Sequence, residues 1–220
     1  MTTNAARFAR RSSHGAPLPA AFFERDTEQV ARDLLGAVLE CRIGGLTRGR
    51  IVETEAYLGE HDPACHAAAG RTERTRWLYG APGTAYVYFI YGMHWCFNAV
   101  TRRVDEPSAV LVRGLEPLDG LALMRRRRDH PRDDRQLANG PAKLCEAMAI
   151  TAAINGRTLA RAPVLIRRGT PVPDDAVEVT TRIGITRAAD WPLRFAVADN
   201  PFVSAMPRSP RSGGRHRRSP

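Results

Sequence analysis

Residues 84–98 decide the fold: Thr84-Ala85-Tyr86-Val87-Tyr88-Phe89-Ile90-Tyr91-Gly92-Met93-His94-Trp95-Cys96-Phe97-Asn98. They give the strongest strand signal in the chain, because aromatic and β-branched side chains favour a pleated sheet. Gly92 is the natural turn residue, which predicts a β-hairpin with Tyr91 and Met93 at or near its tip. Strand alternation places Tyr86 and Tyr88 together on one face of the first arm.

The tip of this hairpin allows two interpretations. Aromatic and thioether side chains at an exposed tip are unfavourable unless a partner covers them. DNA-bending and base-flipping proteins insert such apolar wedges between base pairs. Alternatively, Tyr91 and Met93 fold back onto the core of the protein itself.

The segments on either side of the hairpin predict both helices and strands. Asp26-Thr27 is a plausible cap for a helix whose apolar stripe includes Val30, Leu34 and Val38. The other expected elements are a strand pair around Gly44-Gly45 with its second arm over 48–57, a long structured loop over 59–83, strands over 108–113, 163–168, 177–184 and 193–198, and helices over 117–128 and 141–150. Strands, then helices, then strands again favour an α+β fold over a doubly wound sheet.

The composition indicates a globular protein of one domain. The chain has 220 residues, of which 43% are hydrophobic and 25% charged. That length suffices for a sizeable core and corresponds to one domain, with or without tails. No apolar run approaches the roughly 18–20 residues of a membrane helix, so we expect no transmembrane helix.

The net charge of +10 comes mostly from the two ends. Residues 1–20 contain three arginines and residues 207–220 contain five, with no acid in either stretch. Without these eight, 25 basic residues stand against 23 acidic ones. We therefore expect three parts: a disordered basic arm over 1–16, a domain over 17–206, and a disordered Arg-rich tail over 207–220. The basic arm superficially resembles a transit peptide.

The cysteine and histidine spacing argues against disulfides and gives little support for a metal. The four cysteines lie far apart with no C-x-x-C pair, which fits a reduced intracellular protein: Cys41, Cys65, Cys96 and Cys145. His61 and His66 bracket one of them, but a zinc site needs further convergent ligands and none is evident. We expect neither a metal nor a cofactor.

Two glutamates in the strand Ile51-Val52-Glu53-Thr54-Glu55-Ala56-Tyr57 are candidates for acid–base chemistry. Alternation places Glu53, Glu55 and Tyr57 on one face. Burial and mutual repulsion of two such carboxylates raise at least one pKa, as a general base requires. A solvated strand face that happens to carry two glutamates is the alternative.

Several polar segments are suited to phosphate contacts. Arg71, Thr72 and Arg74 belong to a basic, hydroxyl-rich loop of the kind that binds the DNA backbone, although a solvated loop has the same composition. Asn139-Gly140-Pro141 enters a helix whose N-terminus could hold a phosphate. The run Arg125–Arg128 is either a DNA-binding stripe or a charged helix end facing water.

Taken together, these blocks resemble the alkyladenine (3-methylpurine) DNA glycosylase family. The similarity runs in order from about Phe22 to Ser204 and departs at His94-Trp95 and in the Arg71 loop. The matching blocks are Ile51–Tyr57, His66, Tyr86-Val87-Tyr88, Tyr91-Gly92-Met93, Asn98, Val110–Leu118 and Gly140–Leu144. The resemblance implies a compact single-domain α+β fold with a mixed, mainly antiparallel curved sheet flanked by helices, and a hairpin that probes the DNA minor groove.

The resemblance also implies catalytic and substrate-binding roles. Glu55 activates water and Arg113 helps to position it. Tyr57, His66 and Tyr88 form the pocket that sandwiches a flipped base.

It further assigns the residues that select the base and contact the duplex. Asn98 opposes the exocyclic amino group of normal guanine. Tyr91 fills the gap left in the duplex, while Met93, Arg71, Thr72 and Arg74 contact DNA.

The expected protein is therefore a monomeric, monofunctional glycosylase of the bacterial cytoplasm that acts on damaged purines in double-stranded DNA. Lys143 is the only lysine, so no well-placed amine is available to form a Schiff base. The rival interpretations are a non-enzymatic basic nucleic-acid-binding protein, a helix-hairpin-helix glycosylase, for which no matching motif is found, and a tRNA-modifying or formyl-transferring enzyme.

Overall fold

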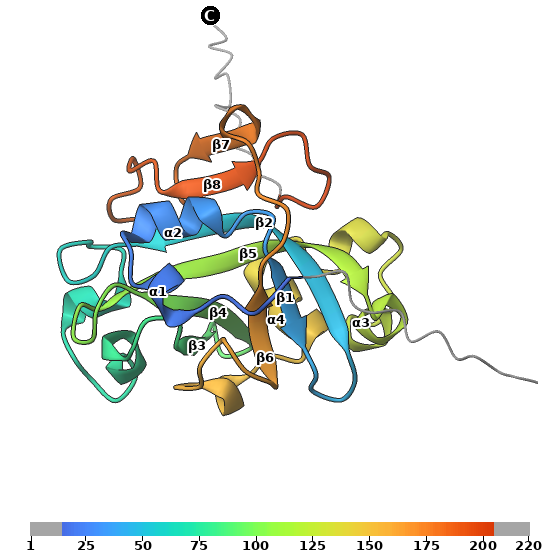
Figure 1. The fold of residues 1–220 in the computed structure, drawn as a ribbon, viewed down its shortest axis with the longest axis horizontal. Helices are drawn as coiled ribbons and strands as arrows, with labels where there is room; N and C mark the ends of the chain where they lie inside the picture. Colours follow the sequence, from blue (N-terminus) through green and yellow to red (C-terminus); the bar gives the residue numbers. More distant parts are fainter. Residues whose placement is uncertain (1–14, 205–220) are drawn as a thin grey trace, which may run out of the picture.

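The computed structural model describes residues 15–204, which form one antiparallel sheet with helices on both faces (Figure 1). The sheet order is β3-β4-β5-β2-β1-β6, and β8 joins β2 with β7 outside it. The strands are β1 (Val38–Cys41), β2 (Thr47–Tyr57), β3 (Ala85–Ile90), β4 (His94–Thr101), β5 (Ser108–Asp119), β6 (Val164–Arg167), β7 (Val177–Thr180) and β8 (Arg194–Val197). The predicted α+β class is confirmed.

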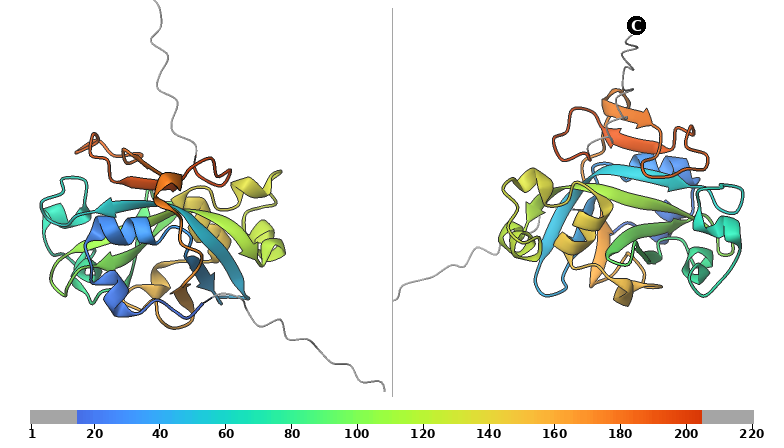
Figure 2. Two further views of the ribbon diagram at one scale, coloured as in Figure 1. Left: turned by 45° about the horizontal axis from the view of Figure 1, so that its top comes forward. Right: turned by 180° about the vertical axis from the view of Figure 1, so that it is seen from behind.

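The helices are short. They are α1 (Ala20–Phe23), α2 (Thr27–Asp33), α3 (Leu121–Arg127) and α4 (Pro141–Met148), and single 3-10 turns include η1 (His66–Ala69), η2 (Arg76–Tyr79) and η4 (Ala152–Ile154). Helix α2 lies over β2 and β5 in Figure 1, whereas the view from behind in Figure 2 brings α4 in front of β4 and β5. No helix within residues 15–204 is long and apolar enough to cross a membrane.

Strand β2 is central because it has different neighbours along its length. One edge pairs with β5 throughout. The other edge pairs with β1 up to Arg50 and with β8 from Glu53 to Glu55. Register shifts on either side of Glu53 mark bulges, which bend a strand and redirect its side chains. Glu53 and Glu55 therefore lie in the middle of the sheet, fully buried.

The predicted hairpin consists of β3 and β4, paired from Ala85↔Ala99 to Ile90↔His94. Tyr91 and Gly92 both have positive φ, at 53° and 67°, and the Met93 N–H donates to the Ile90 carbonyl. Tyr91 and Met93 are 77% and 66% exposed. The tip thus projects from the protein and does not fold back onto the core.

The N-terminal part of the domain follows the sequence expectations with one correction. Asp26 caps α2, its side chain accepting from the backbone N–H of Glu28 and Gln29. Val38 is not on the helical stripe, because the chain turns at Gly36 and Val38 begins β1. Gly15 and Ala16, assigned to the basic arm, hydrogen-bond to Arg168, whereas the rest of the arm and the 207–220 tail lie outside the described residues.

The predicted helix over 117–128 is partly wrong. Its first residues extend β5, and only Leu121–Arg127 is helical. Residues 117–119 stay in the sheet because Asp119 pairs with Arg48 and Pro117 pairs with Gly49. A register shift between Arg48 and Gly49 accommodates the proline, which has no N–H to donate.

Two clusters of buried side chains divide the interior. The larger one lies between the sheet and its helices. The smaller one lies under the loop over 59–83 and includes Cys65, Leu78, Tyr79 and Tyr86, with Tyr57 and Tyr88 packed against it. The second cluster gives the tyrosines of β2 and β3 a rigid backing.

Candidate active site

Glu55 is a fully buried carboxylate held by donors from three parts of the chain. The Ile183 backbone N–H donates to Oε1 at 2.7 Å and the Tyr57 hydroxyl donates to Oε2 at 2.9 Å. Arg113 Nη1, from β5, lies 3.2 Å from Oε1. These contacts fix the orientation of the carboxylate without exposing it to solvent.

Glu53, two residues earlier, is held even more tightly. It accepts from Arg113 Nε at 3.1 Å, from Arg194 Nε at 2.7 Å, and from both the N–H and the hydroxyl of Ser204 at 2.8 and 2.7 Å. Gly114 makes room for it, since a Cβ there would lie 3.1 Å from Glu53 Oε2. Glu53 thus anchors Arg113, which in turn contacts Glu55.

The two carboxyl groups have pKa values shifted in opposite directions. Burial by itself raises the pKa of Glu53, but Arg113, Ser204 and Arg194 outweigh it and hold the pKa below its usual value. Burial dominates at Glu55 and raises its pKa, although Arg113 and the hydrogen bonds partly offset it. A raised pKa is what a proton acceptor needs, so Glu55 is the candidate base of the two.

A cavity of about 380 Å³ opens over this cluster. The residues that line it include Tyr57, His66, Tyr88, Asn98 and Arg113. Glu55 lies directly behind the cavity wall, in contact with Tyr57, Arg113 and Ile183, all three of which line the cavity. The volume falls within the usual range for small-molecule sites.

Several aromatic side chains line the cavity, among them Tyr57, His66, Tyr86 and Tyr88. The rings of His66 and Tyr88 lie 4.4 Å apart in an edge-to-face arrangement. His66 Nδ1 lies 2.9 Å from the hydroxyl of Tyr86. Burial, together with the nearby Arg74, lowers the pKa of His66 to about 4, so the imidazole is neutral at neutral pH. The cavity therefore offers uncharged ring surfaces.

Asn98 is fixed across the hairpin. It is paired with Tyr86 in the β3–β4 register, and its Nδ2 donates to the Tyr86 carbonyl at 3.1 Å. It is buried and lines the cavity. Its amide therefore presents a fixed polar group to whatever enters.

The hairpin tip lies at the edge of the same cavity. Tyr91 lines it while remaining mostly exposed, whereas Met93 is exposed without lining it. Arg74 approaches the hairpin, with Nη2 donating to the Phe89 carbonyl at 3.4 Å and Cζ 6.0 Å from the Tyr88 ring. One surface thus combines apolar tip residues, a cation and the cavity mouth.

Comparison with known proteins identifies the family of the chain. Residues 21–201 match the family described as methylpurine-DNA glycosylase (MPG). The chain belongs to this family. A relative from Methanoculleus marisnigri is 50% identical over 190 residues, which is 85% of this chain and 98% of the relative. One from Myxococcus xanthus is 48% identical over 194 residues, 86% and 94% of the two chains, and both are named "Putative 3-methyladenine DNA glycosylase".

The other expected DNA-contact residues of this DNA glycosylase are engaged within its own loops. Arg71 Nη1 donates to Asp105 at 3.2 Å, and both side chains are exposed. The hydroxyl of Thr72 lies 3.0 Å from that of Thr75. Both residues stay candidates for DNA contact, and the exposed Arg71–Asp105 pair contributes little to stability, so a phosphate can replace Asp105.

The Arg125–Arg128 run is largely occupied by intramolecular contacts. Arg125 pairs with Asp134, Arg127 donates to the carbonyls of Ile43 and Ala147, and Arg128 pairs with Glu146. These contacts anchor α3 to its surroundings.

Two further residues of the site are not predicted by the sequence pattern, because they come from segments distant from Glu55 in the chain. Strand alternation places Tyr86 on the same face as Tyr88, and the structure shows that Tyr86 also contacts His66 and lines the cavity. Ile183 contributes a backbone N–H, which no side-chain pattern could reveal. Within residues 15–204, no group of three or more His, Cys, Asp or Glu side chains is arranged to hold a metal ion.

Proposed function

We propose that this glycosylase flips an alkylated purine out of duplex DNA and hydrolyses its N-glycosidic bond with a water activated by Glu55. The observation that supports this most strongly is the buried Glu55 carboxylate directly behind an aromatic cavity. Flipping is needed because the target atom is unreachable inside a duplex. The products are the free base and a strand with an abasic site.

The chemistry follows from the position of the charges. Positive charge develops on the sugar as the base leaves, as in glycoside hydrolysis. An ionised Glu55 stabilises that charge and accepts a proton from the attacking water. Arg113 holds Glu55 in place and is itself held by Glu53, so it does not have to move during the reaction.

The cavity favours electron-poor purines. An alkylated, positively charged base stacks well on tyrosine and gains from cation–π attraction, which assigns this role to Tyr57 and Tyr88. A neutral His66 places no opposing cation beside such a base. Asn98 selects against normal guanine, whose amino group would clash with it or remain unpaired.

The exposed tip provides the contact with the duplex. Tyr91 occupies the gap left by the flipped nucleotide, with Met93 beside it in the minor groove. Arg71, Thr72 and Arg74 contact the phosphates near the cavity mouth. The protein acts as a monomer on DNA in the bacterial cytoplasm.

The test is to incubate the protein with dimethyl sulfate-treated duplex DNA and to count abasic sites. The proposal expects abasic sites in strands that stay intact until treated with alkali. DNA binding without abasic sites would favour the non-enzymatic alternative. Strand cleavage accompanied by a covalent adduct on borohydride treatment would indicate an amine nucleophile instead of water.

A further inference from the structure

Asp62 and Arg182 form a buried ion pair beside the cavity, 120 residues apart in the chain. Both side chains are fully buried. Arg182 Nη1 donates to Asp62 Oδ2 at 2.5 Å, and Nη2 donates to Oδ1 at 2.9 Å. Asp62 also accepts from the backbone N–H of Leu58 and Ala64, so it is fixed to the loop that follows β2.

Arg182 is also in contact with the end of β2 itself. Its Nη1 donates to the Ala56 carbonyl at 3.0 Å. Its guanidinium carbon lies 4.7 Å from the centre of the Tyr57 ring and 5.9 Å from that of Trp191. The pair thus lies against the cavity residue that also hydrogen-bonds to Glu55.

The residue that follows Arg182 is the Ile183 that donates to Glu55. Strand β7 ends at Thr180, so the next residues are not held by the sheet. Within the described part of the chain, the hydrogen bonds of residues 181–187 to other segments come from the Arg182 side chain and the Ile183 N–H. Ile183, Gly184 and Ile185 line the cavity.

We propose that Arg182 and Asp62 are positioning residues that hold the Ile183 N–H against Glu55 and fix the cavity wall formed by 183–185. This inference rests on the proposed role of Glu55. A buried ion pair adds little net stability compared with apolar side chains of similar size. We infer that the pair instead places the backbone N–H of Ile183. This placement matters because a misplacement of about 1 Å in an active site can reduce the rate about a hundredfold.

The charge of Arg182 also interacts with Glu55, and Asp62, fully buried in the same ion pair, offsets that charge. We assign the effect of the pair on Glu55 to position, which the Asp62→Asn variant separates from charge. The other groups that face Glu55 are Arg113 on β5, Glu53 and Tyr57 on β2, Tyr88 on β3 and Cys96 on β4, and of these Tyr57 also contacts Arg182.

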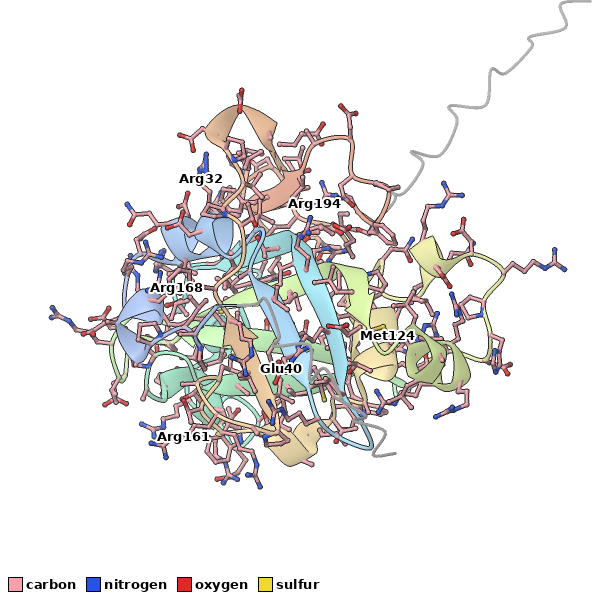
Figure 3. The ribbon with its side chains drawn as sticks, turned by 45° about the vertical axis from the view of Figure 1, so that its right-hand side comes forward. Arg32, Glu40, Met124, Arg161, Arg168 and Arg194 are labelled. Atoms are coloured by element: carbon pink, nitrogen blue, oxygen red, sulfur yellow. The ribbon has the colours of Figure 1, made fainter. Side chains whose placement is uncertain are left out.

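Three variants test the proposal through single-turnover excision at saturating enzyme, measured across pH. Arg182→Met keeps the unbranched apolar stem of the side chain beside Tyr57 and Trp191 but removes the guanidinium group and its donors. Arg182→Lys retains the charge and one donor nitrogen. Arg161→Met is the control for loss of an arginine, because Arg161 is exposed before β6 and lies low in the view of Figure 3, away from the Arg194 that contacts Glu53.

We expect Arg182→Met to slow excision about tenfold to a hundredfold at neutral pH. The acidic limb of its pH profile should move to higher pH, because Glu55 loses a donor that stabilises the carboxylate. Arg182→Lys should restore part of both effects, and Arg161→Met should match the wild type. If Arg182→Met loses activity only in proportion to its loss of folded protein, with an unmoved acidic limb, the proposal is wrong.

Asp62→Asn separates position from charge and also serves if Arg182→Met does not fold. It leaves the Arg182 charge uncompensated, which by electrostatics alone would move the acidic limb to lower pH. Loss of positioning moves the limb to higher pH, which is the result we expect. A shift to lower pH, or none, would overturn the proposal. Failure of wild-type protein to release any base would refute the proposed function instead, so the two failures are distinguishable.

Discussion

A glutamate-to-glutamine substitution should lower the stability of the protein at Glu53 and slow base excision at Glu55. Glu53→Gln removes the partner of two buried guanidinium groups, those of Arg113 and Arg194, whose side chains are 8% and 3% exposed. Glu55→Gln removes a carboxylate whose ionisation the fold opposes, since burial raises its pKa. The first change therefore acts on stability and the second on chemistry.

The magnitudes follow from these contacts. Breaking a buried ion pair by removing one partner costs about 3–5 kcal/mol. For a domain of this size each kcal/mol lowers Tm by roughly 2–4 °C, so Glu53→Gln should lower Tm by on the order of 10 °C. Glu55→Gln should leave Tm unchanged or raise it, a common trade between stability and activity, and should slow excision by roughly two or more orders of magnitude.

The sign of the pH dependence gives a further check. Because the folded pKa of Glu55 lies above the unfolded value, ionisation of this carboxyl destabilises the fold as pH rises through that interval. The Tm of Glu55→Gln should therefore gain on the wild type as pH increases. Thermal unfolding and single-turnover excision of both variants provide the assay. Retained excision in Glu55→Gln with its loss in a well-folded Glu53→Gln would refute the assignment.

Four more outcomes are expected. Tyr91→Ser should weaken binding to lesion DNA by about 1–3 kcal/mol, the contribution of one aromatic–base stack, whereas a large fall in Tm would mean that Tyr91 supports the core. Glu40→Gln should destabilise the protein at neutral pH, because Arg167, Arg48 and Arg42 outweigh burial and lower the pKa of Glu40 to about 2. The unfolding free energies of wild type and variant should differ by about 2–3 kcal/mol, and this difference should vanish as pH falls from 4.5 through 2. Deleting 1–14 and 207–220 should make the dependence of log affinity on log salt shallower and leave single-turnover excision unchanged; a collapse of that rate would place an end of the chain in the site. Borohydride should trap no DNA adduct, since the Lys143 amine donates to Asn139 at 2.9 Å; an adduct lost in Lys143→Ala would refute the water mechanism.

Local patterns predicted the parts of the site that a single strand or turn determines. Alternation in residues 51–57 placed Glu53, Glu55 and Tyr57 together, and the structure joins Tyr57 and Glu55 directly. The positive φ values at Tyr91 and Gly92 explain why the hairpin turns where the sequence indicated. These features depend on neighbours within a few residues, which is why the sequence reveals them.

Contacts between distant segments could not be predicted in the same way. Ser204 reaches Glu53 across 151 residues, and Arg182 reaches Asp62 across 120. The sequence also could not say which of Glu53 and Glu55 keeps a raised pKa, because that depends on how many donors each receives. The β5 residues assigned to a helix show the same limit, since pairing with β2 overrides their local preference.

We expect Glu55 to drive hydrolytic release of an alkylated purine from DNA. The most direct measurement is chromatography of the bases released from dimethyl sulfate-treated duplex DNA by the wild type and by Glu55→Gln. We predict that the wild type releases methylated purines and leaves intact strands with abasic sites, while Glu55→Gln binds the same DNA and releases almost none. Equal release by the two proteins, or release of no base by the wild type, would contradict the account.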